Sequence, residues 1–223
     1  MPNPLQRRSS VPAGLGCPFA VAAGVGVVVA VALGIVMAGT SAPSGPDRWA
    51  ADIVSGWWPA PGTIAYAIDF VGRPWVVVAI AAVTALLAVG LRRRRLAVVA
   101  LVAPAVTGLV ATIAKPLAGR TIHGTNLSYP SGHVAAATTL AGVLALLAVD
   151  VVHAGRVLGM AGFLIGALAS GGVMAVDQVA ISAHYPTDAL GGLATAIVVV
   201  VAVATAVDRA ADRLPAARRL FRT

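Results

Sequence analysis

The segment Tyr129-Pro130-Ser131-Gly132-His133 places a hydroxyl, a backbone without a side chain and an imidazole together at the start of an apolar run. Proline disfavours helix in the residue before it and serine is a good N-cap, so the sequence predicts a helix beginning here. The first amides of a helix have no partner within it and lie at the positive end of its dipole, which suits an anion such as phosphate. Gly132 leaves those amides uncovered. His133, in the first turn, can transfer a proton to or from a bound group.

A second imidazole, His184, comes four residues before the carboxylate of Asp188. Pro186 suits the first position of a helix, which places Asp188 at the third position, where its carboxylate can reach back. An imidazole whose other nitrogen is held by a carboxylate can attack phosphorus. A second imidazole can protonate the leaving oxygen and later activate water. We therefore assign the nucleophile to His184, its support to Asp188 and the acid–base role to His133.

Cations and a helix start are available to hold the phosphate. Lys115 and Arg120 follow the preceding apolar run. With Ser131 and the amides near Gly132 they can carry the charge of a pentavalent phosphorus. Lys115 is the only lysine of a chain that otherwise uses arginine and contains no glutamate. Charged residues at membrane depth are costly and usually functional, so we expect these side chains to meet in one site.

A metal site is the alternative interpretation, because His133, His184, Asp177 and Asp188 are plausible ligands. The neighbouring cations would repel a metal ion but attract phosphate, so we expect no metal and no other cofactor. His123 lies close to the site in the sequence and is a possible further member, as is Asp177.

The composition is that of a membrane protein. The chain is 59% hydrophobic and only 11% charged, whereas an ordinary soluble domain is about a quarter charged. The formal net charge of +8 comes from arginines without a long basic, aromatic-rich surface, so nucleic acid is not an expected partner. Cys17 is the single cysteine, which excludes an intramolecular disulfide. It precedes the first apolar run and is interpreted as a residue at the membrane edge.

Six apolar runs approach the length of about 20 residues that a helix needs to cross a bilayer. They lie at about 18–39, 75–91, 96–114, 132–151, 157–176 and 189–207. The sequence predicts an all-α fold, with a six-transmembrane-helix bundle over 18–207 between a cytoplasmic tail at 1–17 and a basic cytoplasmic tail at 208–223. The first run can also be read as a cleaved signal peptide. Because it is long for one and no clear cleavage site follows, a retained helix is favoured.

The segment 40–74 is the longest that does not span, and it contains Trp49, Trp57, Trp58 and Tyr66. Aromatic residues among apolar ones favour a segment lying in the membrane interface, which can cover part of the site. A solvated loop is the alternative.

The distribution of positive charge predicts the orientation. With the N-terminus in the cytoplasm, twelve of the sixteen lysines and arginines fall on the cytoplasmic side, as the positive-inside rule requires. The four on the other side are Arg48, Arg73, Lys115 and Arg120. We therefore expect a multi-pass protein of the inner (plasma) membrane, with both termini cytoplasmic and the site on the outer face.

These residues resemble the type 2 phosphatidic acid phosphatase family of membrane enzymes, whose motifs are Lys-x6-Arg-Pro, Pro-Ser-Gly-His and Ser-Arg-x5-His-x3-Asp. The second motif is intact at 130–133, and the end of the third at His184 and Asp188. The resemblance covers about residues 75–207. It implies a six-helix bundle that removes phosphate from a lipid without a metal, through a phosphohistidine at His184. The implied partners are membrane lipids and a lipid phosphate substrate: a polyprenyl phosphate or diphosphate, or a glycerolipid phosphate.

The first and third motifs are incomplete. Counted from Lys115, the arginine and proline of the first motif fall on Ile122 and His123. The serine and arginine of the third fall on Asp177 and Gln178, which makes Gln178 a possible site residue. With two arginines missing, we expect lipid monophosphates to be preferred over diphosphates. A lipid-phosphate binding or transport protein that kept the pocket and lost turnover is the alternative function.

Overall fold

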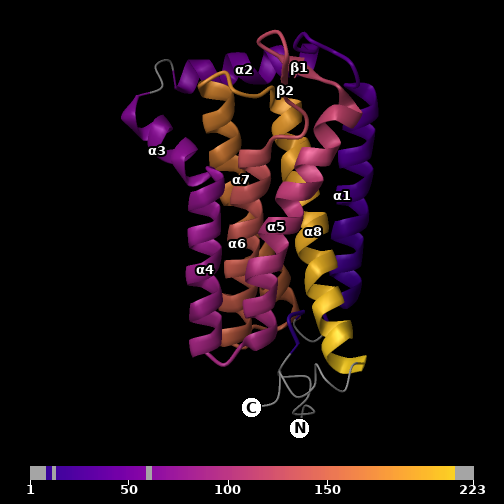
Figure 1. Cartoon of the computed structure of the whole chain (residues 1–223), viewed down its shortest axis with the longest axis vertical. Helices are drawn as coiled ribbons and strands as arrows, with labels where there is room; N and C mark the ends of the chain where they lie inside the picture. Colours follow the sequence, from indigo (N-terminus) through magenta and orange to yellow (C-terminus); the bar gives the residue numbers. More distant parts are fainter. Residues whose placement is uncertain (1–8, 12–13, 59–61, 214–223) are drawn as a thin grey trace.

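The computed structural model describes residues 9–11, 14–58 and 62–213 of the chain, and the description below concerns these residues. They form eight α-helices and one small hairpin (Figure 1), so the predicted all-α class is confirmed. The helices are α1 Gly16–Val36, α2 Gly45–Trp57, α3 Thr63–Val71, α4 Pro74–Gly90, α5 Arg94–Ala118, α6 Gly132–Val151, α7 Arg156–Ala180 and α8 Pro186–Arg213. The strands β1 (Thr121–Ile122) and β2 (Asn126–Leu127) pair antiparallel.

Five helices of the described residues are long and apolar enough to cross a membrane: α1, α5, α6, α7 and α8. Helices α3 and α4 meet at a bend of 62° and make a sixth candidate if they are counted as one broken span. These helices are those of a multi-pass membrane protein, as expected. Helices α5, α7 and α8 run past the predicted ends, and α8 continues to Arg213.

Helix α8 lies at the centre of the bundle and packs against α1, α5, α6 and α7. Its first turns are rich in glycine and alanine, and small residues let membrane helices approach closely. A Cβ added at Gly192 would lie 2.4 Å from the backbone oxygen of Ser131. This position therefore requires glycine, and the close approach brings the starts of α6 and α8 together.

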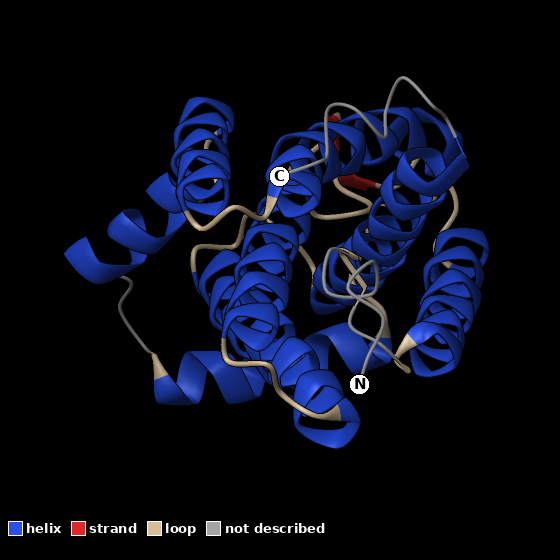
Figure 2. Cartoon of the chain, turned by 90° about the horizontal axis from the view of Figure 1, so that it is seen from below, coloured by secondary structure: helices blue, strands red, loops and turns tan. Residues whose placement is uncertain are grey.

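The largest apolar core fills the half of the bundle away from the hairpin. Phe19 of α1 meets Phe163 of α7 edge-on, with ring centroids 4.9 Å apart, and both rings are buried among Leu146 and Val200. Seen along the bundle, everything described is helical apart from the hairpin and the connecting loops (Figure 2). The core thus provides the rigid frame beneath the polar end.

The two ends of the bundle differ in their polar contacts. At the end opposite the hairpin, Arg93 pairs with Asp150, and Arg95 reaches Asp208 at 3.3 Å and Asp212 at 2.7 Å. At the other end, α2 lies across the ends of the long helices beside the hairpin (Figure 1). Much of the segment 40–74 is thus helical, in α2 and α3, while residues 59–61 lie outside the described part.

Tyr129 links α1 to this polar end. Its hydroxyl donates to the backbone oxygen of Ala30, and its ring packs so closely on Gly191 that a Cβ there would lie 2.4 Å from it. Burial and the nearby charge of Asp188 raise the pKa of Tyr129 to about 12. The hydroxyl therefore stays protonated and keeps its donor role at neutral pH.

Candidate active site

The starts of α6 and α8 carry the two predicted histidines to one end of the bundle. Helix α6 begins as predicted, with Ser131 as N-cap, its Oγ accepting from the amide of Val134 at 3.5 Å. Helix α8 begins at Pro186, and Asp188 reaches back to accept from the amide of Tyr185 at 3.1 Å. The amide of Ser131 donates to the backbone oxygen of Asp188 at 2.9 Å. This bond fixes the two helix starts to each other.

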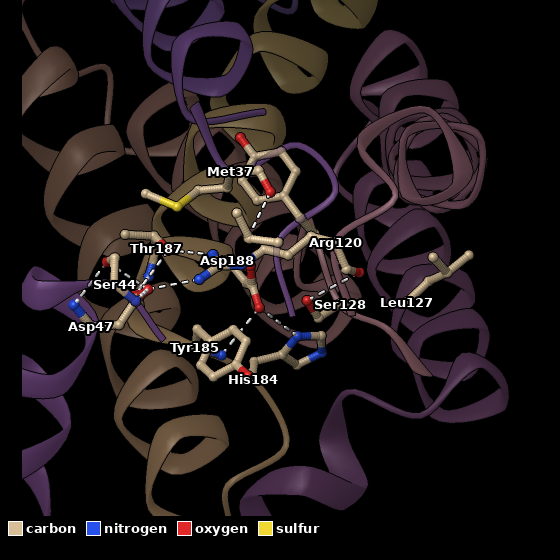
Figure 3. Close-up of polar contacts among 12 residues, drawn as sticks. Met37, Ser44, Asp47, Arg120, Leu127, Ser128, His184, Tyr185, Thr187 and Asp188 are labelled. Carbon is tan, nitrogen blue, oxygen red and sulfur yellow. Dashed lines mark hydrogen bonds and ion pairs between the residues drawn. The ribbon is translucent and has the colours of Figure 1, made fainter. Parts of the chain in front are cut away.

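His184 and Asp188 lie close to each other, as the sequence predicted. Nδ1 of His184 is 3.7 Å from Oδ2 of Asp188, which is fully buried. Figure 3 shows Asp188 between His184 and Arg120. Nδ1 of His184 is buried and has no hydrogen bond within the described part of the chain. Catalytic hydrogen bonds are often long before substrate binds, so this distance is compatible with the predicted support of His184 by Asp188.

Arg120 is at the centre of a buried ion cluster, and this differs from its predicted role. Its guanidinium donates to Asp188 and to Asp47, each at 2.7 Å, and to the hydroxyl of Thr187. It stacks 4.4 Å from the ring of Tyr185 and is fully buried. Both terminal nitrogens therefore face protein groups, and Arg120 joins α2, α8 and the α5–α6 connection. We expected this arginine to contact phosphate, but its terminal nitrogens are engaged by Asp47, Thr187 and Asp188.

Asp47 is a site-supporting residue that our sequence analysis missed. It is fully buried and accepts from the amide of Thr187 at 2.9 Å as well as from Arg120. Burial favours its protonated form, but hydrogen bonds from Ser44 and Thr187 outweigh it and lower the pKa of Asp47 to about 2. The capping pair Ser44-x-x-Asp47 is visible in the sequence as a helix start. Its contact with Thr187 of α8, 140 residues away, cannot be seen in the sequence.

Lys115 remains available to an anion. Its Nζ donates to the backbone oxygen of Leu127 at 2.7 Å, and no ion pair is found for it within the described residues. It lines a cavity of about 480 Å³ between α4, α5 and α6. The walls of this cavity are almost entirely apolar, and His133 and Gly132 lie with Lys115 among its few polar or open positions. A Cβ at Gly132 would meet open space, as an exposed helix start requires.

His133 lies within a cluster of charged side chains. Its Nε2 is 3.4 Å from Oδ1 of Asp69 in α3. Lys115, Arg73 and His184 are near enough for their charges to act on it. Asp69 also accepts from Nε2 of Gln178 at 3.1 Å. Asp69 and Arg73 were not predicted, because no local pattern links the bend between α3 and α4 to the start of α6.

The remaining predicted residues lie around this centre. Gln178 is buried, and its amide also donates to the buried Asp177 at 3.3 Å. His123 contacts the backbone oxygen of Ser182 at 2.7 Å. With His184, it lines a second cavity of about 290 Å³ between α2 and the α7–α8 turn. The structure thus places His123 at the outer edge of the site. Gln178 lies next to Asp69 and links it to Asp177.

The alternative of a metal centre requires at least three ligands close together. Among the described residues no three His, Cys, Asp or Glu side chains are grouped as a metal site. Asp188 has one oxygen on Arg120 and the other on the amide of Tyr185.

No family model, curated protein or solved structure matches this chain. Its function is therefore inferred from the residues and geometry of the site.

The ion cluster generates a prediction about stability. Replacing Asp47 with Asn leaves a buried guanidinium with one carboxylate fewer, and removing one partner of a buried ion pair typically costs about 3–5 kcal/mol. Because the folded-state pKa of Asp47 is held at about 2, below the usual 3.8, its contribution is complete above about pH 4 and is lost as the pH falls through 2. We expect Asp47→Asn to unfold at lower temperature than wild type in detergent at pH 7, with the difference shrinking towards pH 2.

Thermal unfolding followed by circular dichroism measures this difference. Asp52→Asn on the same helix is the matched control and should match wild type. A difference in unfolding temperature between wild type and Asp47→Asn that is the same at pH 7 and at pH 2 would contradict the low pKa of Asp47 in the folded protein.

Proposed function

We propose that this protein is a membrane enzyme that removes phosphate from a lipid phosphate without a metal, through a phosphohistidine at His184. This is the activity of the phosphatase family that its motifs resemble. The alternative is a lipid-phosphate binding or transport protein without turnover. The paired histidines, each with a carboxylate nearby, favour the enzyme.

One observation carries the proposal: an apolar cavity has an ammonium, an imidazole and an uncovered helix start among its lining residues. Lys115, Gly132 and His133 lie on a cavity of about 480 Å³ whose other walls are almost entirely apolar. A lipid phosphate likewise combines an apolar hydrocarbon chain with a charged head group, so its two parts match the two kinds of lining in this cavity. The chain would lie between α4 and α5, and the phosphate near Lys115 and the first amides of α6.

The chemistry follows from the two histidines. Nε2 of His184 attacks phosphorus, the N–P bond forms, and the bond from phosphorus to the lipid oxygen breaks as His133 gives that oxygen a proton. His133 then takes a proton from water, which attacks phosphorus and releases inorganic phosphate and free His184. Asp188 stabilises the positive imidazole of His184 during the first step.

The cations near the phosphate differ from those expected. Arg120 acts through Asp188, and Lys115 and Arg73 are the positive groups beside His133. Arg73 is about half exposed, and its side chain has room to turn towards a bound phosphate. Two cations suit the two charges of a monophosphate, so we retain the expected preference for lipid monophosphates.

The placement in the membrane is part of the proposal. We take α4, from which α3 bends away by 62°, as the sixth span, and place α2 with α3 in the interface. Exposed aromatic side chains on these helices, Trp49, Trp57 and Tyr66, suit that position. The positive-inside rule then puts the arginines of the α4–α5 turn in the cytoplasm and the site, at the opposite end (Figure 1), on the outer face.

The first test is turnover of lipid phosphates by the purified protein in detergent. His184→Ala should abolish release of inorganic phosphate. His133→Ala should slow it by about 10²-fold or more and accumulate a phosphoenzyme whose N–P bond survives base but not acid. His153→Ala, at the other end of the bundle, is the control and should match wild type. Wild-type activity should persist in EDTA.

Two results would contradict this proposal. Loss of activity in EDTA with recovery on adding zinc would favour the metal interpretation. A wild-type protein that binds lipid phosphates but releases no phosphate would be the binding or transport protein.

A second test concerns the cavity. Gly108 of α5 lines it, and a Cβ there meets open space. Gly108→Phe should therefore fill the path of the chain and raise KM for a long prenyl phosphate about 10-fold, or about 1.4 kcal/mol. KM for a short-chain alkyl phosphate should change little. Gly24→Phe on α1, where a Cβ also meets open space outside this cavity, is the matched control. Equal effects on both chain lengths would place the lipid elsewhere.

The orientation is tested with single cysteines in a Cys17→Ser background. A cysteine replacing Thr125, in the hairpin loop, should react with a membrane-impermeant thiol reagent added to intact cells. A cysteine replacing Arg156, at the opposite end, should react only after lysis. The reverse pattern would place the site on the cytoplasmic face.

A further inference from the structure

We propose that Asp69 is a positioning residue that holds the imidazole of His133 for proton transfer, so that each histidine of the site has its own carboxylate. This inference rests on the proposed phosphatase function and deepens it. It concerns a residue that belongs to no motif, on a nine-residue helix between two longer ones.

The carboxylate of Asp69 lies among three polar side chains. Oδ1 is 3.4 Å from Nε2 of His133 and accepts from Nε2 of Gln178 at 3.1 Å. Oδ2 is 3.8 Å from Nε of Arg73, four residues further along. Gln178 is buried and therefore fixes the direction of the carboxylate. An anion held in this way can in turn fix the ring that it faces.

The backbone at the bend between α3 and α4 also positions this ring. A Cβ added at Gly72 would lie 2.2 Å from Cδ2 and 2.7 Å from Cγ of His133. Only glycine therefore fits here, and the imidazole packs directly against the bend. With Cδ2 and Cγ close to the Gly72 backbone and Nε2 facing Asp69, the ring has a defined orientation. Under this proposal, Nδ1 is the nitrogen that gives the proton to the leaving oxygen.

The surrounding charges give the carboxylate an electrostatic role. Lys115 from α5, Arg73 from the bend and His184 from the α7–α8 turn all lie near His133. Asp69 is the carboxylate found within ion-pair distance of His133 in the described part of the chain. It offsets these positive groups when the imidazole carries the proton that the lipid oxygen needs. Asp188 has the same relation to His184, at 3.7 Å.

The two pairs differ in how firmly they are held. Asp188 is fully buried and paired with Arg120, whereas Asp69 is 20% exposed and sits on α3, outside the long helices. The nucleophile is therefore supported from within the bundle. The acid–base group is supported from the segment that we place in the membrane interface, which a lipid entering the cavity would pass.

The test compares substrates that differ in leaving group. General acid catalysis contributes about 10²–10⁴-fold and matters most for a poor leaving group. Because His133 also serves the later attack of water, which is common to all substrates, the comparison uses kcat/KM, which depends only on the steps up to departure of the leaving group. Asp69→Asn should therefore lower kcat/KM for an alkyl lipid phosphate about 100-fold, while kcat/KM for 4-nitrophenyl phosphate, whose leaving group needs no proton, should fall less than about 5-fold. Asp69→Glu should restore part of the activity on the lipid. Asp52→Asn, an exposed aspartate of the neighbouring helix α2, is the matched control.

A double mutant distinguishes an effect of Asp69 through His133 from a general effect on the structure. If Asp69 acts through His133, Asp69→Asn should add little loss in a His133→Ala background, because the two changes remove one function. Equal losses of kcat/KM on both substrates, or fully additive losses of kcat/KM in the double mutant, would overturn the inference. An unchanged kcat with tighter inhibition by inorganic phosphate would also overturn it. The carboxylate of Asp69 would then only compete with the substrate phosphate for the positive groups of the site. Failure of wild type to hydrolyse any lipid phosphate would overturn the proposed function and this inference together.

Discussion

A buried guanidinium between two carboxylates holds the polar end of this molecule together. Arg120 and both its partners, Asp47 and Asp188, are fully buried. Burying such charges is favourable only when every one is paired and hydrogen bonded. Arginine suits the position because its planar fork can serve two carboxylates and still stack on the ring of Tyr185. The cost of breaking the cluster is what fixes α2 over the starts of the long helices.

The cluster also separates two kinds of cation that look alike in the sequence. Arg120 is neutralised by its neighbours and serves to orient Asp188, which faces His184. Lys115 contacts backbone oxygens and lines the apolar cavity. A positive group without a carboxylate partner attracts an anion far more strongly than one that is already paired. Under the proposed function, catalytic support and phosphate attraction are therefore divided between these two residues.

The polar end combines a rigid part with a part attached through a bend. Helices α6 and α8 are joined by the close approach at Gly192 and by the hydrogen bond from Ser131 to Asp188. Helix α3 contacts His133 through Asp69 and through the bend at Gly72. It belongs to none of the five long apolar helices. Asp188, which faces His184, thus belongs to the joined helices, whereas the surroundings of His133 depend on α3.

The sequence by itself determined what depends on local pattern. Apolar length predicted the long helices, and N-cap chemistry predicted the starts of α6 at Ser131 and of α8 at Pro186, including the reach of Asp188 back to Tyr185. The tertiary structure alone decided which distant groups meet. The sequence shows Asp47 only as part of a helix cap and Asp69 as part of no motif. Arg120 was expected to bind phosphate but has the burial of a structural ion. A charged side chain takes its role from partners that are far away in the chain, and neither periodicity nor capping chemistry encodes those contacts.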